Sequence, residues 1–189
     1  GMKKNQKIED ILLTPSTKAE TGHDIYISRK EIIDEKIVEK NIYEKMEEAA
    51  LKLFKFGQDY CNKNGLIMVD TKYEFGLKEG ELVLIDEIHT QDSSRFWILD
   101  TYEERFANNE EPEILDKEIF RGWLMDTYPR IFPNIKPDEK IPPISEDIKI
   151  ELAKRYMRSY KKITGVDFRA EVSDVKKRIN ESLKEAQYL

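Results

Sequence analysis

The sequence contains a single cysteine, Cys61, among its 189 residues. One cysteine excludes an internal disulfide framework and any multi-cysteine zinc or iron–sulfur site. It is typical of the reducing cytosol, so we expect a cytoplasmic protein. No apolar run approaches the ~20 residues needed to span a bilayer, and the longest, 82–85, has the length of a strand. No signal-peptide segment is visible near the start, and we expect no membrane partner.

Basic residues are in the minority, with 32 Lys and Arg against 38 Asp and Glu and a net charge of −6. This balance argues against a nucleic-acid partner. It does not argue against small anionic ligands, because local clusters of side chains hold those. The chain also lacks a Gly-rich phosphate-binding loop of the Walker or dinucleotide type.

Two helices are predicted in the first third of the chain. Ser28 and Glu31 form a capping box that predicts a short helix over 29–38. A longer helix over 40–62 is predicted from apolar residues at helical spacing, and Cys61 near its end is expected to be buried. The expected buried face comprises Ile42, Met46, Ala49, Ala50, Leu53 and either Phe56 or Gly57.

Strand signals follow. Residues 66–75 and 81–88 are predicted to form a hairpin around Gly76 and Gly80, and 96–99 is a further short apolar piece. The remaining expectations are a loop over 100–115, a helix over 117–127 capped by Asp116, a Pro-rich surface loop over 128–144, a helix from Ser145 to Thr164 ended by Gly165, and a last helix opened by Ser173. These elements predict one α+β domain over 1–189, with a small antiparallel sheet packed against several helices.

The first predicted strand carries an unusual row of charges. Asp70, Lys72 and Glu74 alternate with apolar residues and Thr71, so they are expected to share one face. The simplest interpretation is the solvated face of an edge strand. A functional interpretation requires charged side chains from another segment to lie close to this row.

Loop length decides whether Asp86 is that second group. A two-residue turn at Lys78 and Glu79 would pair Thr71 with Asp86, whereas a three-residue loop would place Asp86 opposite Lys72 on the charged face. We predict the three-residue loop, with Gly80 in the left-handed conformation. Glu74 and Asp86 would then converge like the oxygen ligands of Mg²⁺.

The two histidines, His23 and His89, lie far apart in the sequence. Together with acids they could form a zinc site, but no ligand spacing supports one. Each is better explained as a hydrogen-bonding loop residue.

Four segments carry a more specific pattern. They are a loop over 14–24, the run around VDTKYEFG at 65–76, DEIHTQDSSRFW at 86–97, and 116–124. In this order and spacing they resemble the SAICAR synthetase family, the phosphoribosylaminoimidazole-succinocarboxamide synthases of purine biosynthesis. The resemblance extends from about residue 6 to 165.

The resemblance concerns the family's central and C-terminal portion. It implies that the N-terminal lobe, which carries a Gly-rich, Lys-containing ATP loop, is absent from this chain. Two alternatives stay open: a separately encoded subunit supplies the lobe, or the chain is part of a longer protein. Gln91 departs from the family, which usually has Pro at this position. We expect low or no activity from the chain alone, because half of the cleft would be open to water.

The resemblance implies an ATP-dependent ligase that joins carboxyaminoimidazole ribonucleotide to L-aspartate through an acyl phosphate. It assigns the Mg²⁺ ligands to Glu74 and Asp86 and the catalytic roles to Lys72 and Asp70. The residues implied in substrate binding are Arg95, Arg121, Asp70, Lys18, Asp24 and Ser94. Arginines suit this role because their planar group binds phosphate or carboxylate in a bidentate manner.

Two other hypotheses remain open at this point. The chain could be a non-catalytic module that binds the ribonucleotide or a partner lobe. It could also be a structural subunit whose charged strand is merely solvated.

Overall fold

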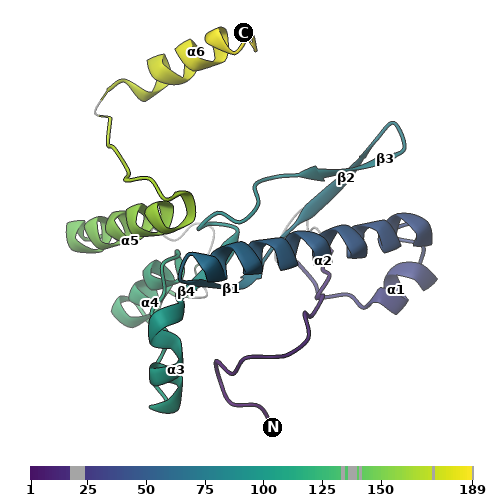
Figure 1. Cartoon of the computed structure of the whole chain (residues 1–189), viewed down its shortest axis with the longest axis horizontal. Helices are drawn as coiled ribbons and strands as arrows, with labels where there is room; N and C mark the ends of the chain where they lie inside the picture. The colour runs from purple at the N-terminus through teal and green to yellow at the C-terminus, as the bar shows by residue number, and fades with distance from the viewer. Residues whose placement is uncertain (18–23, 133–134, 136–139, 141, 172, 189) are drawn as a thin grey trace.

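The computed structural model describes residues 1–17, 24–132, 135, 140, 142–171 and 173–188. It has the expected α+β architecture (Figure 1), with helices and small antiparallel sheets. The described elements are α1 (Arg29–Asp34), α2 (Lys40–Lys63), β1 (Leu66–Thr71), β2 (Glu74–Lys78), β3 (Glu81–Ile85), β4 (Ser94–Ile98), α3 (Leu99–Ala107), α4 (Glu118–Thr127), α5 (Glu146–Thr164) and α6 (Val175–Glu185).

Helix α2 is the longest element and lies against β1 (Figure 1). The predicted helix over 40–62 is therefore confirmed. Gly57, not Phe56, faces inward: Gly57 is buried, whereas Phe56 is 66% exposed. A Cβ atom at Gly57 would lie 2.5 Å from the Met68 methyl carbon and 2.7 Å from His89 Cε1. The absence of a side chain thus allows the close approach of α2 to β1.

The core is built on the pairing of β1 with β4. Leu66 lies opposite Ile98 and Met68 opposite Phe96, and all four side chains are buried. Cys61 from α2 and Leu115 complete this cluster. Between Met68 and Asp70 the register shifts by one residue, which is a β-bulge at Val69.

The predicted strand over 66–75 is divided in the structure, and the predicted hairpin register is wrong. The first part is β1, which pairs with β4, while β2 begins at Glu74 and pairs with β3 in a second two-stranded sheet. A two-residue turn at Glu79 and Gly80 joins β2 to β3, with φ of 54° and 83°. Two left-handed residues in succession are typical of a type I′ turn.

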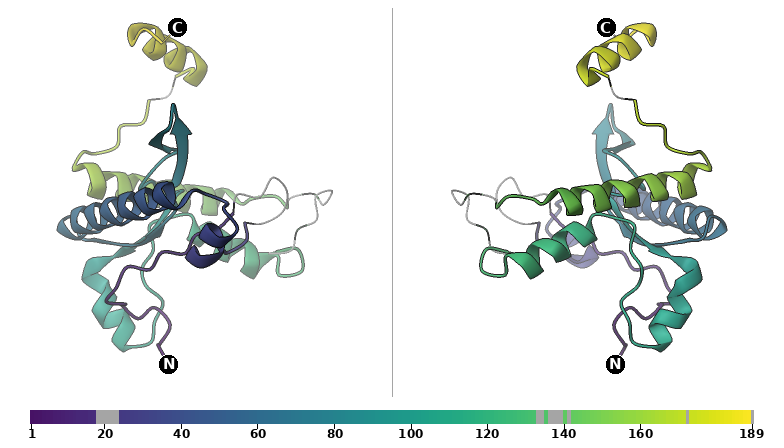
Figure 2. Two further views of the ribbon diagram at one scale, coloured as in Figure 1. Left: turned by 90° about the vertical axis from the view of Figure 1, so that its right-hand side faces the viewer. Right: turned by 90° about the vertical axis from the view of Figure 1, so that its left-hand side faces the viewer.

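The helical predictions are confirmed at most termini. Ser28 and Glu31 form the capping box of α1, but this helix ends at Asp34 and not at residue 38 as predicted. Helix α5 begins after Ser145 and ends at Gly165, whose φ is 73°. The last helix is capped by Asp174, not Ser173. Figures 1 and 2 show α6 standing apart from the rest of the molecule.

One helix was not predicted. Residues 99–107, expected to be part of a loop over 100–115, form α3. Tyr102 from this helix is buried and its ring stacks on Trp97. Packing against β4 outweighs the loop signal of the asparagines that follow the helix.

Among the residues that the structure describes, no helix is both long and apolar enough to cross a bilayer.

Truncating the central aromatic residue of the core tests this fold. Phe96 is 0% exposed, so we expect Phe96→Ala to lower the free energy of unfolding by about 3–5 kcal/mol. Phe56→Ala removes the same ring from an exposed site and should cost under about 1 kcal/mol. Urea denaturation followed by circular dichroism measures both, and equal losses would contradict the assigned core.

Cys61 provides a second test. Burial raises the pKa of its thiol to about 11 from an ordinary value of 9.0. A raised pKa leaves less thiolate at any lower pH, so at pH 8 the folded chain should hold about a hundredfold less thiolate than the unfolded chain. We expect alkylation by iodoacetamide to be slow until denaturant is added. Fast alkylation of the folded chain would show that Cys61 is exposed.

A candidate anion-binding site beside a lysine–carboxylate cluster

Asp70 and Arg95 form the first part of the site. The bulge in β1 pairs them across the ladder, and Arg95 Nε donates to Asp70 Oδ1 at 2.9 Å while Nη2 donates to Oδ2. Both side chains are about half exposed. The hydrogen bond to Asp70 is the main cause of the raised pKa of Arg95. The pair therefore presents a fixed, permanently charged guanidinium at the surface.

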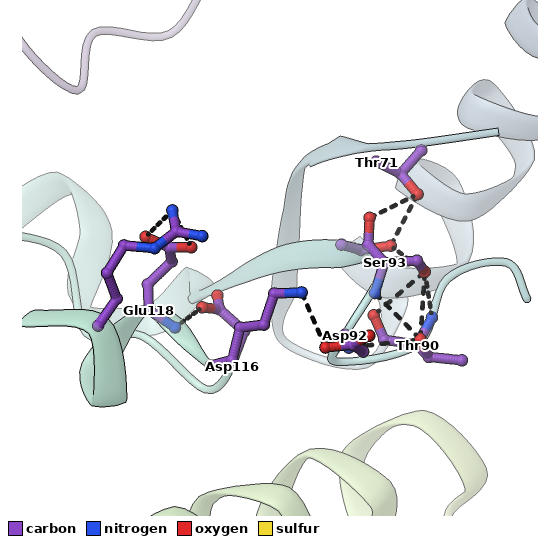
Figure 3. A network of polar contacts seen from close by, with 9 residues as sticks. Thr71, Thr90, Asp92, Ser93, Asp116 and Glu118 are labelled. Atoms are coloured by element: carbon purple, nitrogen blue, oxygen red, sulfur yellow. Dashed lines mark hydrogen bonds and ion pairs between the residues drawn. The ribbon is translucent and has the colours of Figure 1, made fainter. Parts of the chain in front are cut away.

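The hydroxyl groups of the loop before β4 are joined into a network (Figure 3). Thr90 N donates to Ser93 Oγ at 3.0 Å, and Ser93 N donates to Thr90 Oγ1 at 3.1 Å. Ser94 is buried and its hydroxyl donates to Thr71 Oγ1 at 2.8 Å. These bonds fix the backbone that leads into Arg95.

An open pocket of about 210 Å³ lies over this region. It is lined by Asp70, Asp92, Ser93, Ser94, Arg95, Lys117, Glu118 and Arg121. Each of its cations is paired with a lining acid. Besides the Arg95–Asp70 pair, Lys117 Nζ lies 2.8 Å from Asp92 Oδ1, and Arg121 Nη1 lies 3.0 Å from Glu118 Oε1 (Figure 3). Three cations at one pocket are suited to an anionic ligand.

A second cluster lies where β1 ends. Lys72 N donates to Ser93 O at 3.1 Å, and its Nζ lies 3.0 Å from Glu74 Oε1 and 3.3 Å from Asp24 Oδ2. Hydrogen bonds to Glu74 and then to Asp24 raise the pKa of Lys72. Lys72 is therefore a stable cation beside two carboxylates.

A buried hydrogen bond supports this cluster. The Tyr73 hydroxyl and His89 Nε2 lie 2.5 Å apart, and both side chains are partly buried. Burial lowers the pKa of His89 and raises that of Tyr73, so burial favours the neutral form of both groups, which share this hydrogen bond. The bond joins the segment that carries Lys72 and Glu74 to the loop that follows β3. It also explains His89 as a hydrogen-bonding loop residue.

Asp86 does not occupy the position predicted from the hairpin. Glu74 lies opposite Ile85, where β3 ends, and Asp86 follows in the left-handed region with a φ of 68°. Its Oδ1 accepts from Glu87 N at 3.0 Å. Strand alternation therefore ends before Asp86 and does not bring it opposite Lys72.

Comparison with known proteins identifies the family. The SAICAR synthetase family profile matches residues 1–134. The chain belongs to the SAICAR synthetase family. A phosphoribosylaminoimidazole-succinocarboxamide synthase of Legionella pneumophila (strain Paris) is 44% identical over 169 residues, which are 89% of this chain and 52% of that protein. The chloroplastic enzyme of Vigna aconitifolia is 46% identical over 78% of this chain and 42% of its own length.

Solved structures agree. The SAICAR synthase of Saccharomyces cerevisiae in complex with SAICAR has a TM-score of 0.63 and 30% identity, covering 83% of this chain and 47% of that one. A SAICAR synthetase in complex with ADP has a TM-score of 0.53 and 28% identity over 78% of this chain and 48% of its own length. The chain therefore spans about half the length of the relatives that it matches.

The sequence-predicted site residues of this family member fall into three groups. Asp70, Ser94, Arg95 and Arg121 meet at the pocket. Lys72, Asp24 and Glu74 form the neighbouring cluster. Asp86 lies at the end of β3, and Lys18 lies outside the described residues. The roles assigned to these residues stay predictions.

A magnesium ion would need oxygen ligands, which carboxylates supply. Within the described ranges, no three His, Cys, Asp or Glu side chains are grouped to hold a metal. Mg²⁺ usually binds one or two carboxylates together with water and substrate phosphates. Glu74 and Asp86 each offer the hard carboxylate oxygens that this mode of binding uses, and their assignment as ligands rests on the family resemblance.

Sequence reasoning assigned no site role to Asp92, Ser93, Lys117 or Glu118, which also line the pocket. Two features of the sequence could have indicated these residues. They are the density of acids and hydroxyl groups before Arg95 and the position of Lys117 directly after a helix-capping acid.

The ion pairs predict opposite effects of two substitutions on anion binding. Lys117→Met removes a pocket cation and should weaken binding of inorganic phosphate severalfold. Asp92→Asn removes the carboxylate that competes for Lys117 and should strengthen binding severalfold at low salt. Isothermal titration calorimetry with phosphate measures both. Weaker binding by Asp92→Asn would show that Asp92 supports the ligand rather than competing with it.

Proposed function

We propose that this chain carries the ribonucleotide-binding surface and part of the phosphoryl-transfer machinery of a SAICAR synthetase. The reaction is the ATP-dependent joining of carboxyaminoimidazole ribonucleotide to L-aspartate in purine biosynthesis. The observation that carries the proposal is the pocket of three paired cations next to the Lys72 cluster, in a member of this family.

The chemistry requires an activated carboxylate, because an unactivated one is a poor acyl donor. Transfer of the γ-phosphoryl group of ATP to the carboxylate gives an acyl phosphate and ADP. The amine of aspartate then attacks the acyl carbon, phosphate leaves, and an amide forms. Both steps depend on alignment and on neutralisation of charge more than on covalent help from protein.

The pocket suits the ribonucleotide. Arg95 and Arg121 would bind its phosphate or carboxylate. Ser94 also lines the pocket, and its hydroxyl donates to Thr71 Oγ1. Asp70 would contact the imidazole while it orients Arg95. The SAICAR complex of the yeast relative supports a ligand of this class.

Lys72 suits the transferred group. A lysine with a raised pKa stays charged through the neutral range, so it can neutralise developing charge on the phosphoryl oxygens. Its contacts with Glu74 and Asp24 hold the ammonium in place before substrate binds. Asp24, and Lys18 by resemblance, would lie beside the nucleotide and aspartate.

Glu74 and Asp86 are the proposed magnesium ligands. When bound, magnesium would supply charge neutralisation for the phosphate oxygens of ATP. The ADP complex of one relative supports the use of ATP.

The test is SAICAR formation from ATP, Mg²⁺, carboxyaminoimidazole ribonucleotide and aspartate. The chain is assayed alone and with the part of the Legionella pneumophila relative that lies outside the match. We expect turnover in the mixture and little from the chain alone, which also tests whether an ATP-binding lobe must be supplied separately. Binding of the ribonucleotide without turnover in either assay would favour the non-catalytic binding module.

Lys72→Ala should lower kcat by about a hundredfold or more, because a charge that stabilises the transition state is lost. Lys78→Ala is the matched control, since Lys78 is exposed at the far end of β2 and has no proposed role. Steady-state kinetics of SAICAR formation, with the complementing part of the Legionella pneumophila relative present, measures both variants. Equal rates for Lys72→Ala and the unmodified chain would exclude the proposed role of Lys72.

A further inference from the structure

A buried carboxylate lies beneath the pocket and belongs to neither set of proposed ligands. Asp116 is 0% exposed, although acids are rarely fully buried. Its Oδ2 accepts from Phe96 N at 2.8 Å, and its Oδ1 accepts from Glu118 N at 2.8 Å. Figure 3 shows Asp116 beside Glu118, and its bond to Phe96 reaches β4.

The first bond continues the edge of the sheet. Residues 113–115 run alongside β4: Ile98 N donates to Glu113 O at 2.9 Å, and Leu115 N donates to Phe96 O at 3.0 Å. The Asp116 carboxylate then accepts from Phe96 N, where the carbonyl of Leu115 would accept in a regular antiparallel pair. Phe96 follows Arg95 directly in the sequence, so the bond from Phe96 N fixes the backbone that carries Arg95.

The second bond caps α4. Lys117, at the N-cap position, makes no side-chain cap of its own, and Asp116 satisfies the free N–H of Glu118 instead. Glu118 and Arg121 lie on the first turns of this helix and line the pocket. The bond therefore fixes the start of the element that carries Arg121.

We infer that Asp116 is a positioning residue, whose two oxygens set the relative placement of Arg95 on β4 and Arg121 on α4. The inference rests on the proposed function, since it explains how the pocket is shaped for a phosphorylated ligand. Asp116 itself lies behind the pocket and acts through the two arginines.

The chemistry of the site requires a carboxylate. Burial raises the pKa of Asp116, while the bonds from Glu118 N and Phe96 N and the nearby charge of Arg95 oppose that shift. Both backbone partners are donors, so both oxygens must accept. An asparagine offers only one acceptor and would direct its NH₂ group at the other N–H.

The test compares Asp116→Asn with two controls. Asp126→Asn makes the same substitution at an exposed position of α4. Tyr102→Phe removes a hydrogen bond to Asn5 O far from the pocket and controls for lost stability. We expect Asp116→Asn to bind carboxyaminoimidazole ribonucleotide about tenfold more weakly by calorimetry. Both controls should bind like the unmodified chain.

A second variant keeps the inference testable if Asp116→Asn fails to fold. Asp116→Ser retains a capping oxygen for Glu118 and loses the bond to Phe96. We expect it to fold and to lose affinity. A folded Asp116→Asn or Asp116→Ser that binds as tightly as the unmodified chain would overturn the inference.

A ligand-free measurement separates this inference from the proposed function. In NMR spectra of the unliganded chain, the Nε–H signals of Arg95 and Arg121 should shift in Asp116→Asn, and the amides of Phe96 and Glu118 should exchange faster. Amides of α2 should keep their protection. If the unmodified chain fails to bind the ribonucleotide, the proposed function fails. Unchanged signals from both arginines would overturn the role of Asp116 independently.

Discussion

The bulged pairing of β1 with β4 is the constraint on which the site depends. Leu66 and Met68 point into the core, and strict alternation would send Asp70 after them. A carboxylate buried there without a partner would cost several kcal/mol, on the order of the penalty for an unpaired buried charge. The extra residue, Val69, shifts the phase of the strand. Asp70 therefore lies at the surface opposite Arg95.

The same shift turns Thr71 and Ser94 toward each other, where their hydroxyl groups form a hydrogen bond of 2.8 Å. One inserted residue thus separates a charged pair at the surface from a hydroxyl pair beneath it. The close approach of α2 at Gly57 keeps the other side of β1 covered. The pocket and the core therefore share one strand pair.

Local signals were sufficient to predict the parts of the fold that local physics decides. The periodicity of α2, the capping box at Ser28 and Glu31, and the glycine that ends α5 each act within one or two turns of helix. Helix α3 was missed because its stability comes from packing of Tyr102 on Trp97 rather than from its own ends, which lack a side-chain cap. Tertiary contact outweighed local propensity there.

The hairpin register was missed for a related reason. The observed turn needs a left-handed Glu79, a conformation that a residue with a side chain rarely adopts. Gly80 alone suggested a single left-handed position and hence a longer loop. An error of one residue in the turn reverses the face of every residue that follows. The prediction for Asp86 was wrong for that reason.

Motif resemblance pointed to Asp70, Arg95 and Arg121, and the structure brings all three to one pocket. It could not reveal the contacts between segments distant in the sequence. Lys117 and Asp92 are 25 residues apart, and the bond from Phe96 N to Asp116 spans 20. Sequence analysis predicted Asp116 only as a helix cap, because its second partner is apparent only once 113–115 lie along β4.

The acids that line the pocket and the one behind it differ in burial and in the kind of partner they hold. Asp70, Asp92 and Glu118 pair with exposed cations, and such pairs contribute only about 0–1 kcal/mol each. A phosphate could replace these acids as the partner of the cations at little cost in free energy, because hydrogen bonds to charged groups contribute about 1.5–3 kcal/mol. In the unliganded chain, the ion pairs hold the long side chains toward the pocket. This lowers the entropy cost of ordering them on binding, which is about 0.5–1.5 kcal/mol for each side chain.

Asp116, in contrast, is a buried acid. Both of its oxygens are bound to backbone N–H groups, and its side chain is closed to solvent, so no ligand competes for it. A ligand can therefore exchange partners with the exposed acids while the backbone beneath Arg95 and Arg121 stays where Asp116 holds it. Under the proposed function, exposed ion pairs that can exchange partners and a buried Asp116 that cannot would together let a pocket with balanced charges bind an anion without rearranging the fold.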